Sequence, residues 1–195
     1  MNIEYIFPTP IWSSILDIDL DPIKKYIYKL KESSEGRKIS NFGGWQSKEF
    51  FPLEETNESV QSLLKIIERY LKVCYTDYGF FEEPKVDNYW FNINHPGCSN
   101  LEHTHSRCFL SGTIYIDVPE NSGNIVFKRS AFEDYIISSN IGSGTTKLSA
   151  SYWKYSVVPN QIMIFPGWLL HEVEKNNSNN DRISMAFNVR TQTWK

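Results

Sequence analysis

The chain has few of the features that mark secreted, membrane-spanning or metal-thiolate proteins. Its three cysteines, Cys74, Cys98 and Cys108, are odd in number and show no CxxC spacing, which favours free thiols in a reducing compartment. No apolar run approaches the ~20 residues needed to cross a bilayer. The first residues also lack the basic and apolar regions of a secretory signal. We therefore expect a cytoplasmic protein.

An excess of positive charge is missing as well. The chain has 20 Lys and Arg against 23 Asp and Glu, for a net charge of −3. Nucleic acids and anionic membranes attract proteins with a basic field, so we expect neither partner. What the chain does have is 41% hydrophobic and 15% aromatic residues in 195 positions, which is enough for the core of one domain. Nothing in the sequence indicates an oligomeric state.

The first 84 residues have a mainly helical pattern. Asp21 and Pro22 open a periodic stretch that we expect to end near Gly36, with aspartate and proline suited to a helix start. A second helix is predicted from Asn57 to about Tyr78, because apolar residues recur there every three or four positions. Between the two helices, NFGGWQSKEFFP predicts an aromatic loop broken by glycines.

After Pro84 the pattern changes to short stretches rich in β-branched and aromatic residues, which predict strands. Helices only upstream of many such strands predict a mainly β (α+β) protein, with helices on one face of an antiparallel barrel or sandwich. The segment from Lys128 to Trp153 is long and glycine-interrupted, which is typical of a lid or a binding loop. The predicted strands are VDNYWFNIN (86–94), FLSGTIYIDV (109–118), GNIVF (123–127), YSVVP (155–159), QIMIF (161–165) and RISMAFNVR (182–190).

Three of the four histidines have a spacing that suits a metal site. A lone histidine is more often a hydrogen-bonded or surface residue, but His103 and His105 are two positions apart. In a strand, such residues share one face. His171, from a distant predicted strand, would complete a three-histidine site. Imidazole suits Fe, Zn, Cu and Ni, so the ligands alone leave the metal open.

Arg182 indicates what accompanies the metal. It follows His171 by eleven residues, across the turn NNSNND, and Ser184 shares its strand face. A buried guanidinium needs an anion, and its planar fork matches a carboxylate. The pattern therefore favours a site for a dicarboxylate that also chelates the metal. The alternative is a surface salt bridge between Arg182 and Asp181 or Glu172.

Taken together, HTH, SGTIYID, FPGWLLH and RIS followed by AFN resemble the iron(II)- and 2-oxoglutarate-dependent oxygenases. Within that group the chain is most similar to prolyl-4-hydroxylase-like oxygenases of bacteria and phages. Its FPTPIW and GGWQS segments resemble the same subgroup. The resemblance implies a double-stranded β-helix, a jelly-roll or cupin-like barrel. It also implies one oxygenase domain over residues 1–195, with helical support in 1–84 and the barrel in 85–195, in the cytoplasm of a bacterial or phage-infected cell.

The implied activity is that of a dioxygenase with Fe(II) and 2-oxoglutarate as cofactors. It would consume O₂, release succinate and CO₂, and hydroxylate a protein, peptide or small-molecule substrate that the sequence does not identify. Carried over by position, His103 and His171 would bind iron. Arg182 would pair with the far carboxylate of 2-oxoglutarate, assisted by Ser184 and by a hydrogen bond from Tyr115.

Asn94 and Asn92, on a preceding predicted strand, are expected to line the same pocket. The chain departs from the family at His105, which stands where the usual two-histidine, one-carboxylate triad has Asp or Glu. As the third ligand it leaves the metal site one unit more positive. Glu102 and Glu172 should point to the opposite strand face, and Asp117 is a remote replacement.

Two other functions remain open at the level of the sequence. One is a three-histidine metal enzyme of cupin type, which does not use 2-oxoglutarate and has no need of Arg182. The other is a non-catalytic β-barrel binding protein that holds no metal.

Overall fold

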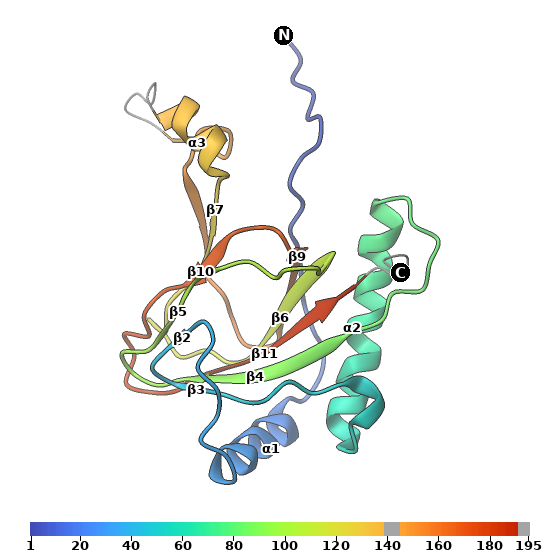
Figure 1. The fold of residues 1–195 in the computed structure, drawn as a ribbon, viewed down its shortest axis with the longest axis vertical. Helices are drawn as coiled ribbons and strands as arrows, with labels where there is room; N and C mark the ends of the chain where they lie inside the picture. The colour runs from blue at the N-terminus through green and yellow to red at the C-terminus, as the bar shows by residue number, and fades with distance from the viewer. Residues whose placement is uncertain (139–144, 191–195) are drawn as a thin grey trace.

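The structure is a computed structural model that describes residues 1–138 and 145–190. Two antiparallel sheets dominate it, and helices lie outside one of them (Figure 1). In chain order the elements are β1 (Trp12–Ile15), α1 (Asp21–Glu32), β2 (Asn41–Phe42), β3 (Trp45–Gln46), the 3₁₀ turn η1 (Pro52–Glu54), α2 (Glu58–Asp77), β4 (Asn88–Asn94), β5 (Ser99–His103), β6 (Leu110–Asp117), β7 (Ile125–Lys128), α3 (Ala131–Ser138), β8 (Tyr152–Tyr155), β9 (Gln161–Pro166), β10 (His171–Val173) and β11 (Arg182–Val189).

The strands are shared between a six-stranded and a five-stranded sheet. The larger sheet has the order β1-β9-β6-β11-β4-β3, and the smaller has the order β2-β5-β10-β7-β8. Consecutive strands of the chain repeatedly change sheet, so that the two sheets enclose a common interior (Figure 1). The prediction of a mainly β protein with antiparallel sheets is confirmed.

Alternation along the central strands separates a helix-facing core from a polar interior. In β11, the fully buried Ile183, Met185 and Phe187 belong to the core that includes the helices. Arg182 and Ser184 take the opposite face and line the barrel interior. Because side chains alternate across a strand, one apolar face anchors the sheet while the other is free for chemistry.

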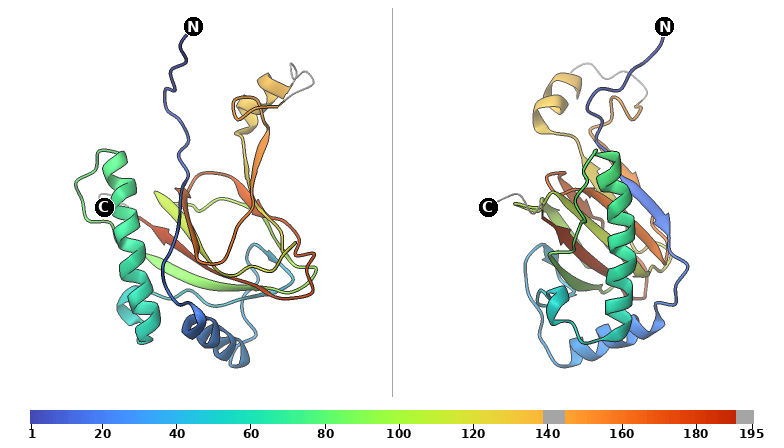
Figure 2. Two further views of the ribbon diagram at one scale, coloured as in Figure 1. Left: turned by 180° about the vertical axis from the view of Figure 1, so that it is seen from behind. Right: turned by 90° about the vertical axis from the view of Figure 1, so that its right-hand side faces the viewer.

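Two amphipathic helices cover the outer face of the six-stranded sheet. Helix α2 runs along that sheet, and α1 lies below it (Figure 2). The side-chain oxygen of Asn57 caps α2 by accepting hydrogen bonds from the Ser59 and Val60 amides, each at 3.1 Å. Both helices bury one apolar stripe, as predicted. None of the helices in the described ranges combines the length and apolar character that a membrane crossing requires.

The segment between the helices is more ordered than a simple loop. It supplies β2 to the smaller sheet and β3 to the larger one. Gly43 and Gly44, both at positive φ, make the turn between these strands. A Cβ on Gly44 would lie 2.6 Å from the Ile93 carbonyl oxygen, so this connection requires glycine.

Two boundaries differ from the sequence-based expectation. The first helix ends at Glu32, before Gly36. The predicted strand YSVVP is wrong, because pairing with β7 places strand β8 earlier, at Tyr152–Tyr155. Residues after Tyr155 turn instead into β9, and Asn160 has positive φ there.

The predicted lid from Lys128 to Trp153 contains regular structure in its described parts. Helix α3 lies at the end of an arm that β7 begins, away from the barrel (Figure 1). The chain returns to the barrel through β8, which pairs with β7. Residues 139–144 of the predicted lid lie outside the described residues.

Candidate metal centre

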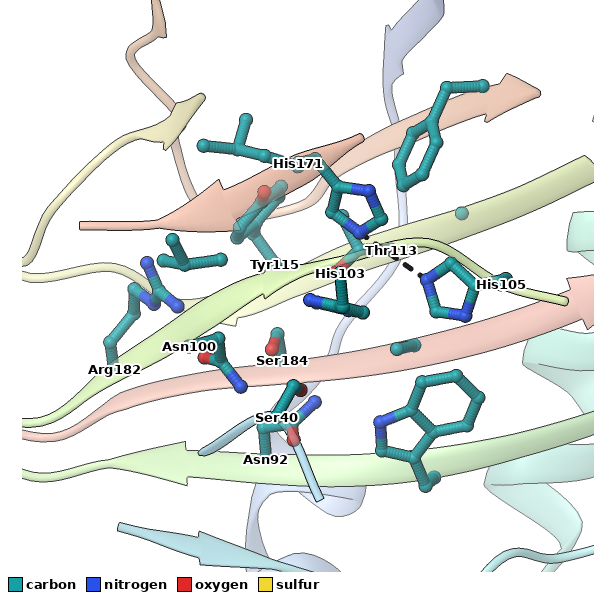
Figure 3. A pocket seen from close by; sticks show the side chains of 16 residues that line it. Ser40, Asn92, Asn100, His103, His105, Thr113, Tyr115, His171, Arg182 and Ser184 are labelled. Carbon is teal, nitrogen blue, oxygen red and sulfur yellow. Dashed lines mark hydrogen bonds between the residues drawn. The ribbon is translucent and has the colours of Figure 1, made fainter. Parts of the chain in front are cut away.

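Three histidines converge inside the barrel, near one end. His103 is the last residue of β5 and His171 is the first of β10, and the two are paired directly across these antiparallel strands. His105 joins them from the segment that follows β5 (Figure 3). One nitrogen of each ring lies within 4.8 Å of the others. The structure thus brings together all three histidines that the sequence singled out.

His105 reaches the cluster for a different reason from the one expected. Strand β5 ends at His103, so alternation along a strand does not orient His105. Its backbone N–H instead donates to the Gly167 carbonyl oxygen at 2.8 Å. That contact ties the segment after β5 to the segment before β10, which brings the ring over the other two.

Hydrogen bonds prepare two of the rings for a metal. Nδ1 of His103 donates to the Leu101 carbonyl at 2.7 Å, and Nδ1 of His171 donates to the Leu169 carbonyl at 2.8 Å. Both Nε2 atoms therefore carry lone pairs, the arrangement that metal-binding histidines obtain from backbone acceptors. Nδ1 of His105 has no such acceptor among the described residues. Its Nε2 lies 3.3 Å from Nε2 of His171 and must be the donor in that contact (Figure 3).

The environment keeps the three rings neutral. Burial is the main reason that the pKa of His105 is lowered to about 3 and that of His171 to about 4, and neighbouring histidines lower both further. Burial also lowers the pKa of His103. Neutral imidazole is the form that binds a metal. The ligand type and the convergence of the rings therefore fit a divalent transition metal.

Arg182 lies in the same cavity and has no counter-ion among the described residues. Only 2% of the residue is exposed, and its Nε has no hydrogen-bond partner within the described chain. Nη1 makes a long contact of 3.5 Å with the Gly123 carbonyl. Burial lowers the pKa of the guanidinium, but arginine remains protonated. A buried positive charge with no acidic partner among the described residues needs an anion from outside.

The two carboxylates considered as surface partners of Arg182 are engaged elsewhere. Asp181 contacts Nδ1 of His95 at 2.6 Å, and Glu172 pairs with Lys128 at 3.1 Å. The surface salt bridge offered as an alternative for Arg182 is therefore wrong. Its guanidinium points into the cavity (Figure 3).

Several hydrogen-bond donors surround the Arg182 end of the cavity. The hydroxyls of Ser184 and Tyr115 line it, and neither has a hydrogen bond to another described residue. Burial raises the pKa of Tyr115 to about 12, so its phenol keeps its proton at neutral pH. Asn100 adds a carboxamide whose oxygen accepts from Nδ2 of Asn94 at 2.9 Å, which leaves the amide nitrogen as a donor. This set suits a carboxylate.

Asn94 lies behind the cavity rather than in its lining. It pairs with Arg182 across β4 and β11, and it acts on the cavity only by orienting Asn100. Asn92 does line the cavity, and its buried side-chain oxygen has no partner in the described chain. The structure therefore supports the expected place of Asn92 and moves that of Asn94 one layer back.

Sequence reasoning missed Asn100 and Trp90. Asn100 precedes His103 by three residues, a spacing that places residues on opposite faces of a regular strand. A register shift in the β5–β10 pair, where His171 opposes His103 but Val173 opposes Asn100, brings both to one face. No residue pattern marks that bulge. Trp90 lines the cavity from β4, and the alternation of that strand could have placed it there.

No carboxylate joins the histidines among the described residues. Glu102 and Glu172 both pair with Lys128, at 2.5 Å and 3.1 Å, on the outside of the smaller sheet. Asp117 forms an ion pair with Lys24 of α1. The expected outward direction of the two glutamates agrees with these contacts, and the remote replacement, Asp117, is wrong.

Comparison with known proteins places this geometry in a family context. The profile of a family described as "Putative 2OG-Fe(II) oxygenase" matches residues 88–188, slightly more than half of the 195 residues. That range holds all three histidines, Arg182 and Ser184. A comparison with curated proteins gives no match.

Solved structures show the fold. A prolyl-4-hydroxylase from Pseudomonas putida is 12% identical over 94% of each chain, with a TM-score of 0.64. HygX from Streptomyces hygroscopicus, solved with nickel and 2-oxoglutarate, is 8% identical over 96% of this chain and 85% of its own, also with a TM-score of 0.64. The carbocyclase SnoK of nogalamycin biosynthesis is 13% identical over 93% and 79%, again with 0.64. These similarities confirm the double-stranded β-helix.

Proposed function

The chain belongs to the 2OG-Fe(II) oxygenase family, and on that premise we propose that it is an Fe(II)- and 2-oxoglutarate-dependent dioxygenase. His103, His105 and His171 would hold the iron. Arg182, Ser184, Tyr115 and Asn100 would hold the far carboxylate of 2-oxoglutarate, with Asn94 supporting Asn100. All of these residues except Asn94 line one cavity, which supports this assignment.

One observation carries the proposal, namely the buried, unpaired guanidinium of Arg182. Burying a charge without a partner is costly, and proteins normally pair or neutralise it. Here that buried charge faces a cavity that also holds the histidine cluster. A ligand with one anionic group for Arg182 and a second for a metal would compensate both ends. 2-Oxoglutarate has this form.

The charges of such a complex are balanced at the metal. Three neutral imidazoles leave a divalent ion with its full charge of about +2, and dianionic 2-oxoglutarate offsets it. The ligand nitrogens of the three histidines lie within 4.8 Å of one another, so binding of one ion by all three would require the rings to move closer together.

When bound, Fe(II) supplies the centre at which O₂ is reduced at the expense of 2-oxoglutarate, giving succinate, CO₂ and an oxidised substrate. The chain's own part is orientation and exclusion of water. His103 and His171 are held by their backbone hydrogen bonds. Buried apolar side chains such as Ile125 and Phe165 line the cavity.

We further propose that the enzyme hydroxylates its substrate and that this substrate is a protein, a peptide or a small molecule. The prolyl-4-hydroxylase from Pseudomonas putida supports hydroxylation. The carbocyclase with the same fold shows that the fold does not determine the outcome. Of the two other functions, a cupin-type enzyme leaves the unpaired Arg182 without a role, and a metal-free binding protein does so for the histidine cluster.

Replacing Arg182 with Met tests the proposal. The variant loses the partner of the anionic ligand, and we expect 2-oxoglutarate to bind roughly 100-fold more weakly. The measurements are calorimetric titration with 2-oxoglutarate and succinate formation under Fe(II) and O₂. Removal of an unpaired buried charge should also raise the free energy of unfolding of the ligand-free protein by about 1–3 kcal/mol, measured by urea denaturation.

The exposed Arg69 on α2 provides the matched control, because Arg69→Met removes the same group far from the cavity. It should leave both binding and stability unchanged. Undiminished 2-oxoglutarate binding by Arg182→Met would contradict the proposal. Activity that persists in this variant without 2-oxoglutarate would favour the cupin-type enzyme.

A further inference from the structure

A second cavity opens directly beside the histidine cluster. It is a cleft of about 430 Å³ that shares His103, His105 and Trp90 with the inner cavity. Its volume lies in the range of sites that hold small ligands or short segments of larger ones. If the proposed function holds, a group bound in this cleft lies next to the metal, so the chemistry of its lining restricts the primary substrate.

The cleft has a polar wall built from side-chain amides. Ser111 donates to the Asn188 side-chain oxygen at 2.8 Å, and Nδ2 of Asn188 donates to the Asn88 oxygen at 3.0 Å. Nδ2 of Asn88 in turn donates to Glu49 at 3.3 Å. Each amide nitrogen carries two hydrogens, and this ladder uses one of them. Asn88 and Asn188, which both line the cleft, therefore each keep one N–H that these bonds do not use.

Gln46 adds an amide that the protein leaves unused. The residue is only 5% exposed and lines the cleft, and its side-chain oxygen has no hydrogen-bond partner within the described chain. Its side-chain nitrogen likewise makes no hydrogen bond to a described residue. A buried polar group without a partner is costly. Gln46 thus keeps its hydrogen-bonding groups for a ligand, which reaches the oxygen only after the amide turns, because that oxygen is shielded from solvent in this conformation.

The charges that line the cleft are already compensated. Glu49 pairs with Arg37 at 3.3 Å and Glu102 pairs with Lys128 at 2.5 Å. Arg190 pairs with Asp87 at 3.1 Å, and none of these three partners lines the cleft. A charged ligand group would lose water here without meeting a free opposite charge. In the inner cavity, by contrast, Arg182 has no acidic partner among the described residues.

We infer that this cleft binds an uncharged, amide-bearing part of the primary substrate, with Gln46 as a specificity-determining residue. A carboxamide pairs with another amide through one N–H and one C=O, which matches both unused groups of Gln46. The indole of Trp90 supplies a flat apolar wall between this amide and the histidines. The amide can belong to a peptide backbone or to a small carboxamide.

Saturation-transfer NMR tests this binding without turnover. The protein is supplied with Zn(II) and 2-oxoglutarate and titrated with four probes: N-acetyl-trialanine amide, the same peptide with a free carboxylate, isobutyramide and methyl glucoside. We expect binding of the neutral amides and at least tenfold weaker binding of the other two. Preference for the blocked peptide over isobutyramide would identify peptide backbone as the source, and the reverse would identify a small carboxamide.

Two variants of Gln46 make the test specific. Gln46→Leu removes both hydrogen-bonding groups, and Gln46→Glu keeps the shape but replaces the donor. Each should weaken binding of the neutral amides about tenfold or more. Gln61→Leu on α2 is the control, because Gln61 lies outside the cleft. Unchanged Zn(II) binding shows that the variants are folded.

Equal binding by wild type and Gln46→Leu would overturn the inference, as would no binding of either neutral amide or a preference for the charged peptide or the glucoside. Its failure is distinct from failure of the proposed function. Amide binding by a protein that forms no succinate would leave the cleft assignment standing. Succinate formation without amide binding would leave only the proposed function.

Discussion

His105 differs from the other two histidines in what holds its ring. His103 and His171 each donate from Nδ1 to a backbone carbonyl two residues earlier, whereas the one hydrogen bond of the His105 ring to a described residue joins its Nε2 to the ring of His171. Because that Nε2 is the donor, it must lose its proton before it can bind a metal at this atom. His105 is therefore the least prepared of the three ligands.

Replacing His105 with Asp should tighten metal binding. The carboxylate adds a negative charge next to a divalent ion whose other ligands are neutral, and it restores the more usual triad. We expect at least a tenfold gain in affinity for Mn(II) without 2-oxoglutarate, about 1.4 kcal/mol, measured by calorimetric titration. The neutral His105→Gln is the control. If Asp binds Mn(II) no more tightly than Gln does, His105 is not a metal ligand.

Among single residues, those whose position follows from the alternation of side chains along a strand can be predicted from the sequence. Arg182 and Ser184 lie two apart on one strand and both face the cavity. His105 was expected beside His103 and is found there, although a backbone contact with Gly167 rather than a strand positions it. Asn100 could not be predicted, because it depends on a bulge created by pairing with β10.

Among the elements, the arm of β7, α3 and β8 is held at its base by one arginine. Nε of Arg129 donates to the Ala150 carbonyl at 2.9 Å, and Nη2 donates to the Leu148 carbonyl at 3.0 Å. The backbone N–H of Arg129 also donates to Ser151 at 2.8 Å. These contacts join the segment that follows β7 to the segment that precedes β8.

Arg129→Ala should loosen the return of this arm to the barrel. Local opening is easier where few contacts hold a segment. The variant loses the three side-chain hydrogen bonds of Arg129, and at about 0.5 kcal/mol each their loss should speed chymotryptic cleavage after Leu148 or Tyr152 roughly tenfold. Mass spectrometry of the fragments locates the cut. Arg69→Ala provides the control. An unchanged cleavage rate at these positions would show that strand pairing with β7 alone holds the arm.

Long elements were predicted from the sequence more reliably than short ones. Helix α2 has 20 residues with a regular apolar stripe and a capping asparagine, so several independent features indicate it. Strand β10 has three residues, and its first is a candidate metal ligand. A stretch of three residues is too short to show the alternation of apolar and polar residues by which a strand is predicted. It is a strand because β5 and β7 pair with it on both sides.

In the molecule as a whole, the helices and the site lie on opposite faces of one sheet. The apolar face of β4, β6 and β11 packs against α1 and α2, while the other face carries polar residues of both cavities, among them Arg182, Ser184 and Asn88. The helical support thus stabilises a sheet whose inner face includes an unpaired guanidinium and unpartnered amides. The division into residues 1–84 and 85–195 stays a prediction, and the first part also contributes β1, β2 and β3.

The buried histidines should make the metal-free protein sensitive to mild acid. In the folded state the pKa of His105 is about 3 and that of His171 about 4, because burial disfavours the charged rings. In the unfolded chain both return to about 6.5. Between these values the unfolded state binds more protons, so stability is complete above pH ~6.5 and falls as the pH drops toward 4.

Urea unfolding of EDTA-treated protein at pH 7, 6 and 5 measures this effect. Two rings that stay neutral only when folded give a slope of up to about 2.7 kcal/mol per pH unit in that window. The double variant His105→Gln, His171→Gln removes both groups, so its stability should change much less between pH 7 and 5, where most carboxylates remain ionised. Because a bound metal requires neutral rings, its affinity should weaken over the same range. Equal pH slopes for the two proteins would mean that the buried rings do not control acid stability.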